Sequence, residues 1–444
     1  MRARLACAVN RGVALVYPRH MTRRIVAAQT IAITLALPVA GCGEVSKLDG
    51  WVQHFNAIHH YDDTSNVVTT HGIGSDQAGD IVFTGLLETP ISFGAAPIGT
   101  AGAANMFLVK LDANGKFVWN VASAPLDEKG AVTAHALTVS AAGDIHVAGG
   151  WAGKVTLGGD PLPEGEGFGA YVAKYDSAGQ HVWDVGILSV GGTDEGFAVR
   201  PVGVVGLAER EGQGLALVSQ CQHGARVGSI ELAGTKQRGL CTFALDPEGK
   251  PLWGNRIDAH YEADTPTARI AFDPQGNVIV GGLRDGASSV EAFARKLDAN
   301  GKEIWLVAFG EGEQTFDGLV VDESGDVLVA GSSADGSSVD RRVRKISAEG
   351  KMLWERSVDG VVGLDIGAKD GLLIASSEPS GQYDYRPIFL TADAAGDQTS
   401  EALVNELWLP SRVRWYGDGS FLTCGNRTLW PEIVVGRQRF VAPQ

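Results

Sequence analysis

Residues 276–281 read GNVIVG, and residues 297–305 read LDANGKEIW. Each stretch places a glycine turn directly before a short strand, and glycine accepts the positive φ that such turns require. The Asp298 carboxylate can accept hydrogen bonds from the backbone of its turn, and Trp305 is a large apolar residue on the returning strand. We therefore predict that each stretch is part of a β-hairpin.

Both elements recur through the chain after residue 50. The LDANGKEIW element has five copies, in which the tryptophan always lies four residues after the glycine, at 111–119, 175–183, 245–253, 297–305 and 346–354. The GNVIVG element has seven copies, which begin at Gly79, Gly143, Gly214, Gly276, Gly325, Gly371 and Gly419. Four-stranded units that repeat in this way are typical of propeller blades. The predicted fold is all-β: a single seven-bladed β-propeller of four-stranded antiparallel blades.

The two ends of the repeat region complement each other. The last unit stops near Phe440 after three strands, whereas residues 50–55 (GWVQHF) form a strand that has no unit before it. Pairing these segments would hide two strand edges, so we predict that the N-terminal strand closes the ring. One copy departs from the pattern, because Ser400 stands four residues after Gly396, where the other units have tryptophan.

These residues resemble the seven-bladed β-propeller (SBBP) repeat of bacterial secreted and surface proteins, over residues 50–440 and most closely over 267–331. The resemblance implies the architecture and little about activity, because propellers host unrelated functions. The tryptophan element also resembles the docking motif of quinoprotein propellers and that of the lipoprotein propeller of the outer-membrane assembly machinery. Adjacent cysteines, usual in quinoprotein dehydrogenases, are absent from this sequence.

The N-terminus resembles a bacterial lipoprotein signal. Arg23 and Arg24 precede an apolar run at 25–40, which is shorter than the ~20 residues of a membrane-spanning helix. The run ends in Val-Ala-Gly-Cys, which resembles a lipobox whose Cys42 takes the lipid. The alternative is an ordinary secretory signal in which Cys42 is incidental.

This interpretation divides the chain into three parts. Residues 1–41 are predicted to be the signal peptide, with Met21 as a second candidate start, followed by a lipid-anchored tether at 42–49 and the propeller at 50–444. The residue after Cys42 is Gly43, whereas an aspartate at this position often retains lipoproteins in the inner membrane. We therefore expect an anchor in the outer membrane, on either its periplasmic or its surface side.

Net charge limits the choice of partners. Removing residues 1–41 takes away six arginines and no acid, so the net charge changes from −15 to −21. Such a surface repels phosphate backbones, which argues against nucleic acid. We expect membrane attachment through the lipid, a protein or glycan ligand, and a monomer.

Linear catalytic motifs are missing from the sequence. It has no Cys-x-x-Cys, His-Glu-x-x-His, phosphate-binding loop or Gly-x-Ser-x-Gly motif. The leading expectation is a non-enzymatic envelope lipoprotein that serves as a binding scaffold without a cofactor. One alternative is a hydrolase or lyase with its site at the channel mouth, which converging ionisable groups in the channel would favour. The other is a scaffold of the outer-membrane assembly type.

Carboxylates recur in the connections between the predicted units. These connections share one rim of a propeller, so they could form a cation-binding face, with Ca²⁺ as the candidate ion. The residues are Asp62, Asp63, Asp127, Glu128, Asp194, Glu195, Asp264 and Asp317. The alternative is solvated loop acids. No metal site is predicted, because the pair His59 and His60 lacks an evident third ligand.

Three cysteines remain after signal removal and lipidation. Cys221 ends the second strand of the third unit and Cys241 begins its third strand, so a disulfide between them would close the intervening hairpin. We predict this bond, with Cys424 as a free core thiol. Two buried thiols on opposite faces are the alternative, because a register slip of one residue moves a side chain through the sheet.

Overall fold

The structure is a computed structural model of the 444-residue chain. It describes residues 47–56, 67–163, 169–190, 203–221, 224–234, 239–259, 268–286, 289–311, 313–335, 338–358, 363–366, 372–379, 385–393, 395–403, 409–416, 420–426 and 432–441. Within these ranges, no helix is long and apolar enough to cross a membrane.

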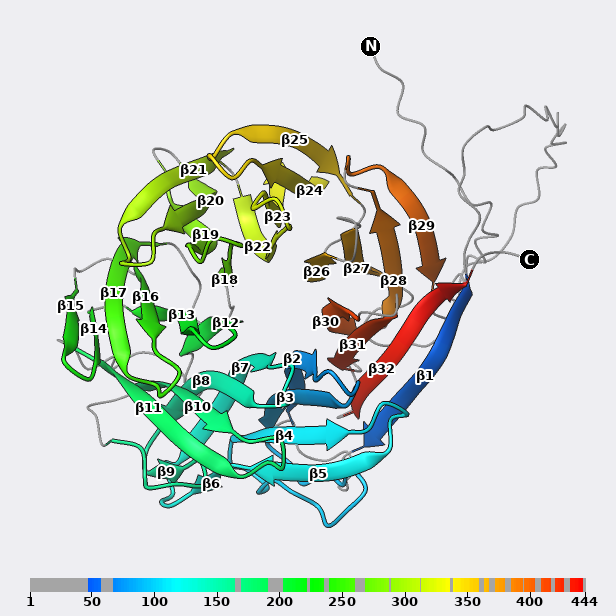
Figure 1. Cartoon of the computed structure of the whole chain (residues 1–444). Helices are drawn as coiled ribbons and strands as arrows, with labels where there is room; N and C mark the ends of the chain where they lie inside the picture. The colour runs from blue at the N-terminus through cyan, green and yellow to red at the C-terminus, as the bar shows by residue number, and fades with distance from the viewer. Residues whose placement is uncertain are drawn as a thin grey trace, which may run out of the picture. The chain divides into compact units, whose positions relative to one another are not determined.

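Seven antiparallel sheets form the blades of a propeller, as predicted (Figure 1). From the channel outward, blade one contains β2 (Val68–Ser75), β3 (Ile81–Leu87), β4 (Asn105–Leu111) and β5 (Phe117–Ala122). Blade two contains β7 (Ala131–Val139), β8 (Ile145–Ala152), β10 (Gly169–Tyr175) and β11 (His181–Ser189). Blade three contains β12 (Val204–Arg210), β13 (Gly214–Cys221), β16 (Gly239–Leu245) and β17 (Pro251–Asp258). Blade four contains β18 (Arg269–Phe272), β19 (Val278–Asp285), β20 (Val290–Leu297) and β21 (Glu303–Glu311).

The remaining blades follow the same order. Blade five contains β22 (Glu313–Val321), β23 (Val327–Asp335), β24 (Ser338–Ile346) and β25 (Met352–Ser357). Blade six contains β26 (Gly363–Ile366), β27 (Leu372–Pro379), β28 (Tyr385–Ala392) and β29 (Gln398–Leu403). Blade seven contains β30 (Leu409–Trp415), β31 (Phe421–Asn426), β32 (Glu432–Val441) and β1 (Lys47–Asn56). Each innermost strand contacts the next, and β30 contacts β2, so the ring is closed.

Closure depends on the N-terminal strand. Strand β1 pairs antiparallel with β32, from Lys47 opposite Val441 to Asn56 opposite Glu432. The two ends of the chain thus share one blade, and each covers an edge that would otherwise be open. The predicted closure is confirmed.

Tryptophans join successive blades. Each lies on the outermost strand of one blade against the turn glycine of the next, in the pairs Trp51–Gly115, Trp119–Gly179, Trp183–Gly249, Trp253–Gly301, Trp305–Gly350 and Trp354–Gly396. At Gly301 the φ of 79° favours glycine, and an added Cβ would lie 2.6 Å from the Trp253 ring. The Trp253 indole also donates a hydrogen bond to the Ala299 carbonyl at 2.8 Å.

The missing seventh tryptophan now has a physical explanation. Ser400 lies on β29, the outermost strand of blade six. The turn that a tryptophan there would meet is absent from blade seven, because its strands β32 and β1 are opposite ends of the chain. The departure in the sequence therefore marks the seam of the ring.

Ion pairs recur inside the blades, and all but Lys174–Asp144 are largely buried. They join a lysine of the third strand to an acid of the turn that precedes the second strand, in the pairs Lys110–Asp76, Lys174–Asp144, Lys296–Asp273 and Lys345–Asp322. The Asp273 carboxylate is fully buried and lies 2.8 Å from the Lys296 ammonium. Burial of both charges makes the pairing obligatory.

A hairpin from blade three extends blade two. Strands β14 (Gly224–Val227) and β15 (Ile230–Ala233) leave blade three between β13 and β16, and β14 pairs with β11. The sheet of blade two therefore has six strands, in the order β15-β14-β11-β10-β8-β7. A separate small sheet joins β6 (Ala124–Pro125) to β9 (Val155–Thr156).

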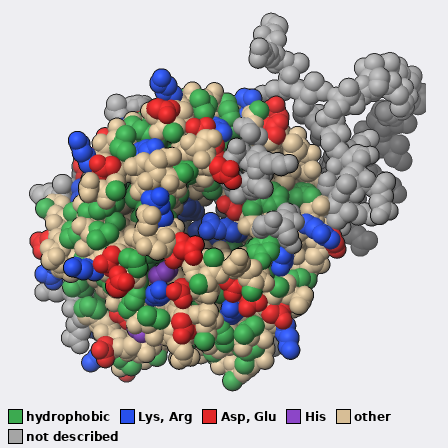
Figure 2. All heavy atoms as spheres, in the orientation of Figure 1, with side chains coloured by type: hydrophobic (Ala, Val, Ile, Leu, Met, Phe, Trp, Pro, Cys, Tyr) green, Lys and Arg blue, Asp and Glu red, His purple; other side chains and the backbone are tan. Residues whose placement is uncertain are grey.

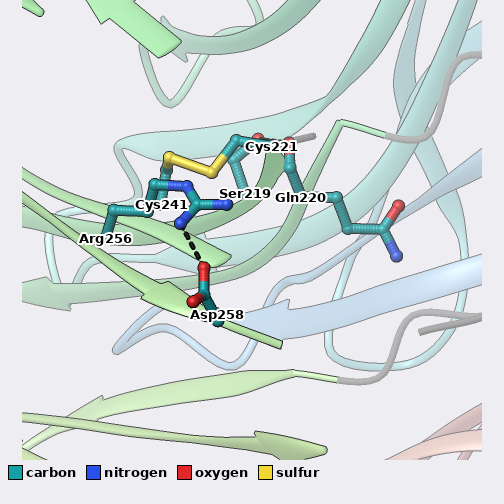
Figure 3. Close-up of a disulfide and its surroundings, with 6 residues drawn as sticks. All are labelled: Ser219, Gln220, Cys221, Cys241, Arg256 and Asp258. Carbon is teal, nitrogen blue, oxygen red and sulfur yellow. Dashed lines mark hydrogen bonds and ion pairs between the residues drawn. A yellow bond between two sulfur atoms is a disulfide. The ribbon is translucent and has the colours of Figure 1, made fainter. Parts of the chain in front are cut away.

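The predicted disulfide lies at the base of this hairpin (Figure 3). Cys221 and Cys241 are bonded, with Cα atoms 5.8 Å apart. Cys221 pairs with Gly239 and Ser219 pairs with Cys241, so the two cysteines are diagonal neighbours two residues apart on one face of the sheet. Cys424 is free and buried, also as predicted.

We expect the double variant Cys221→Ser, Cys241→Ser to be less stable by about 2–3 kcal/mol, because the bond closes a short loop in the unfolded chain. Denaturant titration would measure the difference. Reductant should lower the melting temperature of the wild type and leave that of the double variant unchanged. A free Cys221 in mass mapping of non-reduced peptides would contradict the assignment.

Candidate functional site

The innermost strands carry β-bulges at one level of the channel. In five blades the pairing with the second strand shifts at a corresponding residue, which is left outside the ladder: His71, His135, Val205, Asp317 and Ser411. Blade five has a second shift, at Gln314. Bulges re-aim side chains and are frequent beside functional sites. Four of these five residues are polar, and they form one level around the axis.

Two of the bulged residues touch each other. The rings of His71 and His135, on the neighbouring strands β2 and β7, have centroids 5.0 Å apart. The Thr69 hydroxyl lies 2.8 Å from Nε2 of His71 and orients that ring. The sequence therefore places an imidazole pair on two neighbouring innermost strands, with both ring nitrogens of His135 shielded from solvent.

The next position along each innermost strand is almost always small. It is occupied by Gly72, Ala136, Gly206, Gly318 and Gly363 in five blades. Blades four and seven have Arg269 and Arg412 there, paired with Gly281 and Cys424. Each arginine Nη1 donates to the carbonyl of the residue before it, at 2.9 Å and 2.8 Å. The two arginines thus share one local conformation on blades that face each other across the ring.

Both guanidinium groups are poorly solvated. Burial lowers the pKa of Arg269 to about 9, with a further lowering by the charge of Arg412 and an opposing effect of Asp317. Burial also lowers the pKa of Arg412. Among the described residues, neither guanidinium forms an ion pair with a carboxylate. Because arginine remains protonated at neutral pH, the described innermost strands carry two positive charges, of which that of Arg269 is partly offset by Asp317.

A polar network between blades one and seven lies next to Arg412. The Thr70 and Ser411 hydroxyls lie 3.1 Å apart across β2 and β30. The Asn426 side chain accepts from the Thr70 amide at 2.9 Å and donates to the Val68 carbonyl at 2.9 Å. His71 directly follows Thr70 and Arg412 directly follows Ser411, so both residues are next in sequence to this contact between the strands β2 and β30.

Cys424 belongs to this network as a neutral thiol. Burial raises its pKa, and hydrogen bonds with Ser411 and Thr70 and the charge of Arg412 only partly oppose that effect. Its Sγ lies 3.6 Å from the Ser411 hydroxyl. The thiol therefore contributes packing and a weak hydrogen bond and leaves the arginine charge uncompensated.

Figure 2 shows a hollow at the centre of the ring with basic side chains inside it and acidic side chains around its mouth. A basic interior within an acidic surface favours binding of an anionic group over binding of a neutral one. Two guanidinium forks can hold a carboxylate or a sulfate through bidentate hydrogen bonds.

The structure separates the acids of the predicted rim. Asp127 and Glu128 are exposed in a connection, and the Asp127 carboxylate accepts from the amides of Lys129 and Lys154 at 3.0 Å and 3.1 Å. Asp317 lies on β22 beside the channel and not in a connection between blades. Outside the described residues lie Asp62, Asp63, Asp194, Glu195, Asp264, His59, His60 and Cys42. No metal-ligating group of three acids, histidines or cysteines occurs in the described ranges.

Sequence reasoning missed the channel residues, although a signal exists. His71, His135, Asp317 and Ser411 each stand eight residues before a turn glycine, at Gly79, Gly143, Gly325 and Gly419. A small residue follows the bulge in most units, so arginine at that position in two units is the exception that marks the site.

No protein-family model matches this chain, and no curated protein matches it. Among solved structures, it is similar to a protein of unknown function from Dyadobacter fermentans, at 12% identity over 88% of this chain and 99% of the other, with a TM-score of 0.39. It is also similar to the polysaccharide lyase Uly1, at 10% identity over 87% and 99%, with a TM-score of 0.47. A PL25 ulvan lyase matches at 10% identity over 83% and 93%, with a TM-score of 0.44. Likenesses this distant establish no shared activity, and the fold is established by the strand pairing above.

Proposed function

We propose that this protein is a lipid-anchored propeller of the cell envelope that binds an anionic ligand, bearing a carboxylate or sulfate, in its central channel. The observation that carries the proposal is the placement of Arg269 and Arg412 on opposed innermost strands, where other blades have glycine or alanine. The chain as a whole is acidic, at a net charge of −15. A pair of poorly solvated guanidiniums in such a protein is stabilised by an anion between them.

The ligand test compares three variants of the mature protein by isothermal titration. Oligogalacturonate and dextran sulfate supply the two anionic groups, and dextran is the neutral control. We expect Arg269→Ala and Arg412→Ala each to weaken anion binding by about 10–100-fold, because each removes a charged hydrogen-bond donor. Arg414→Ala is the matched control, since Arg414 lies on the same strand and is exposed.

Binding of the anions should also weaken with added salt, because the attraction is electrostatic. Equal affinity for dextran and the anionic probes would reject the proposal. So would equal losses in the Arg412→Ala and Arg414→Ala variants.

The anchor has its own test. The apolar run at 25–40 and the small residues before Cys42 support lipidation of that cysteine. We expect Cys42→Ser to accumulate as unprocessed precursor without metabolic lipid labelling. Labelling that persists would exclude the lipobox interpretation, and cleavage with release of soluble protein would favour ordinary secretion. Fractionation of wild-type cells would test the proposed outer-membrane location.

Converging ionisable groups in the channel favour an enzyme over a passive scaffold. His71, His135 and Asp317 are bulged residues of the innermost strands, and the two arginines occupy the next position along their own strands. This arrangement supports the enzyme alternative, and the histidine pair is the part of it that simple anion binding does not require.

A further inference from the structure

The outer rim of the ring carries exposed apolar side chains at one repeated position. The outermost strands run around the circumference of the ring (Figure 1). In blades one to five, the residue directly before the blade's tryptophan is large, apolar and between 47% and 56% exposed. These residues form the outer belt: Val118, Val182, Leu252, Ile304 and Leu353. Single exposed apolar residues are ordinary, whereas a set at one level on consecutive blades indicates an interaction surface.

Lysines accompany the outer belt. In four of these five blades an exposed lysine directly follows the turn glycine and stands two residues before the belt residue, at Lys116, Lys250, Lys302 and Lys351. Within the described ranges, none of these ammonium groups forms an ion pair with a carboxylate. The aspartate of the same turn is engaged locally, since Asp112 accepts hydrogen bonds from two amides of its own turn, both at 2.9 Å. The belt therefore combines apolar side chains with neighbouring positive charges.

The face of the ring next to the belt is built from short turns. The amide of the turn glycine donates to the carbonyl three residues earlier, both between first and second strands and between third and fourth strands. Examples are Gly79 to Asp76 at 3.1 Å and Gly115 to Asp112 at 2.9 Å. The two kinds of turn lie side by side, since a Cβ added at Gly79 would lie 3.4 Å from that of Ala113. We call this surface the turn face, and short turns of one length make it suitable for a planar partner.

The chain enters the propeller at the turn face. In the other blades a turn glycine stands four residues before the tryptophan, and in blade seven Lys47, the first residue of β1, stands four residues before Trp51. The Trp51 indole donates to the Ala113 carbonyl, in a turn of blade one, at 3.2 Å. Cys42 precedes Lys47 by five residues, a length of chain that spans at most about 18 Å. A lipid on Cys42 would therefore hold the turn face close to the membrane surface.

We propose that the turn face rests on the lipid bilayer, with the outer belt among the headgroups and its lysines at the lipid phosphates. This inference rests on the lipid anchor proposed above. A lipid on Cys42 fixes only the edge of the ring at blade seven, whereas the belt extends the contact through blade five. Apolar side chains at headgroup level and lysines near anionic lipids both favour such a contact. The channel then stands upright on the membrane, and the hairpin that holds the disulfide points away from it.

The experiment reconstitutes the mature protein into vesicles of phosphatidylethanolamine and phosphatidylglycerol that contain a nitroxide-labelled lipid. A fluorophore on Leu252→Cys reports contact with the bilayer, because the nitroxide quenches only at close range. Leu252 is the sharpest position, since blade three lies across the ring from blade seven (Figure 1). The native cysteines of the propeller do not interfere, because two are bonded and Cys424 is buried.

Ala101→Cys with the same fluorophore is the matched control, because Ala101 is exposed in the connection between β3 and β4, at the other end of blade one. We expect quenching at Leu252 to exceed that at Ala101 by at least about threefold. The additional changes Lys250→Glu and Lys302→Glu should reduce the quenching at Leu252 by about half or more, with thermal melting as the check on folding.

Mass spectrometry of the Cys42 peptide separates the two proposals. Lipid on Cys42 with equal quenching at the two labelled positions would overturn this inference and leave the anchor intact. So would quenching at Leu252 that the lysine changes leave unaltered. A Cys42 peptide without lipid would overturn both the anchor and this inference.

Discussion

Deletion of residues 47–56 is expected to destabilise the protein by more than about 5 kcal/mol, the largest stability loss that we predict. The deletion removes ten paired residues of β1 and exposes the whole edge of β32. It also removes the Trp51 ring from the Gly115 turn, and the Phe55 ring from Phe93, with centroids 5.1 Å apart. Loss of one fully buried aromatic side chain alone costs about 3–5 kcal/mol, and both rings here are half-buried.

The matched truncation removes residues 442–444, which lie beyond the last described strand. Thermal melting and denaturant titration of the two truncated proteins measure the difference. We expect the C-terminal truncation to melt within a few degrees of the wild type. Equal melting temperatures of the two truncated proteins would show that the N-terminal strand does not close the ring.

Asp273→Ala is expected to cost about 3–5 kcal/mol, the usual loss when one partner of a buried ion pair is removed. The Asp273 carboxylate accepts hydrogen bonds from the Lys296 ammonium and from the backbone amide of Asn277, each at 2.8 Å. Alanine would leave the Lys296 charge buried against an empty site. Asp298→Ala is the control, because that partly exposed carboxylate accepts hydrogen bonds from the amides of Asn300 and Lys302 and has no buried charge as a partner. We expect a cost of about 1 kcal/mol.

The same pair predicts a dependence on pH. Burial raises the pKa of Asp273, but its hydrogen bonds with Lys296 and Asn277 and the Lys296 charge outweigh that effect and lower the pKa. Because the folded pKa is lowered, the stabilisation is complete above the ordinary aspartate value and is lost as the pH falls through the folded value. The difference in unfolding free energy between wild type and Asp273→Ala should therefore shrink below about pH 4. A difference that stays constant into acid would show that the charge of Asp273 does not contribute.

Much of the framework is readable from the sequence, because its determinants are local. A turn glycine, an aspartate that caps the turn and a tryptophan four residues later lie within one hairpin, so the copies at 111–119 and 297–305 predict strands directly. The disulfide follows from the same logic, since Cys221 and Cys241 flank one hairpin. The missing tryptophan at Ser400 is also visible in the sequence. Its cause is the absent turn of blade seven, which becomes evident only in the closed ring.

The candidate site was not predicted because its determinants are not local. Arg269 and Arg412 lie far apart in the chain and meet only when blades four and seven face each other. His71 and His135 leave their strands through bulges, and alternation of apolar and polar residues does not reveal a bulge. Asp317 is an acid that the sequence assigns to a connection, whereas the structure places it in the innermost strand β22, where its charge raises the pKa of Arg269.

The tryptophan contacts run in one direction around the ring and stop once, between blades six and seven. A duplicated unit inserted among the first six blades would bring its own tryptophan and its own turn glycine, so every blade would still meet a matching neighbour. A unit inserted at the seam would lack one of these partners. Gain or loss of blades during evolution is therefore permitted inside the chain, whereas the blade that holds both termini must be kept.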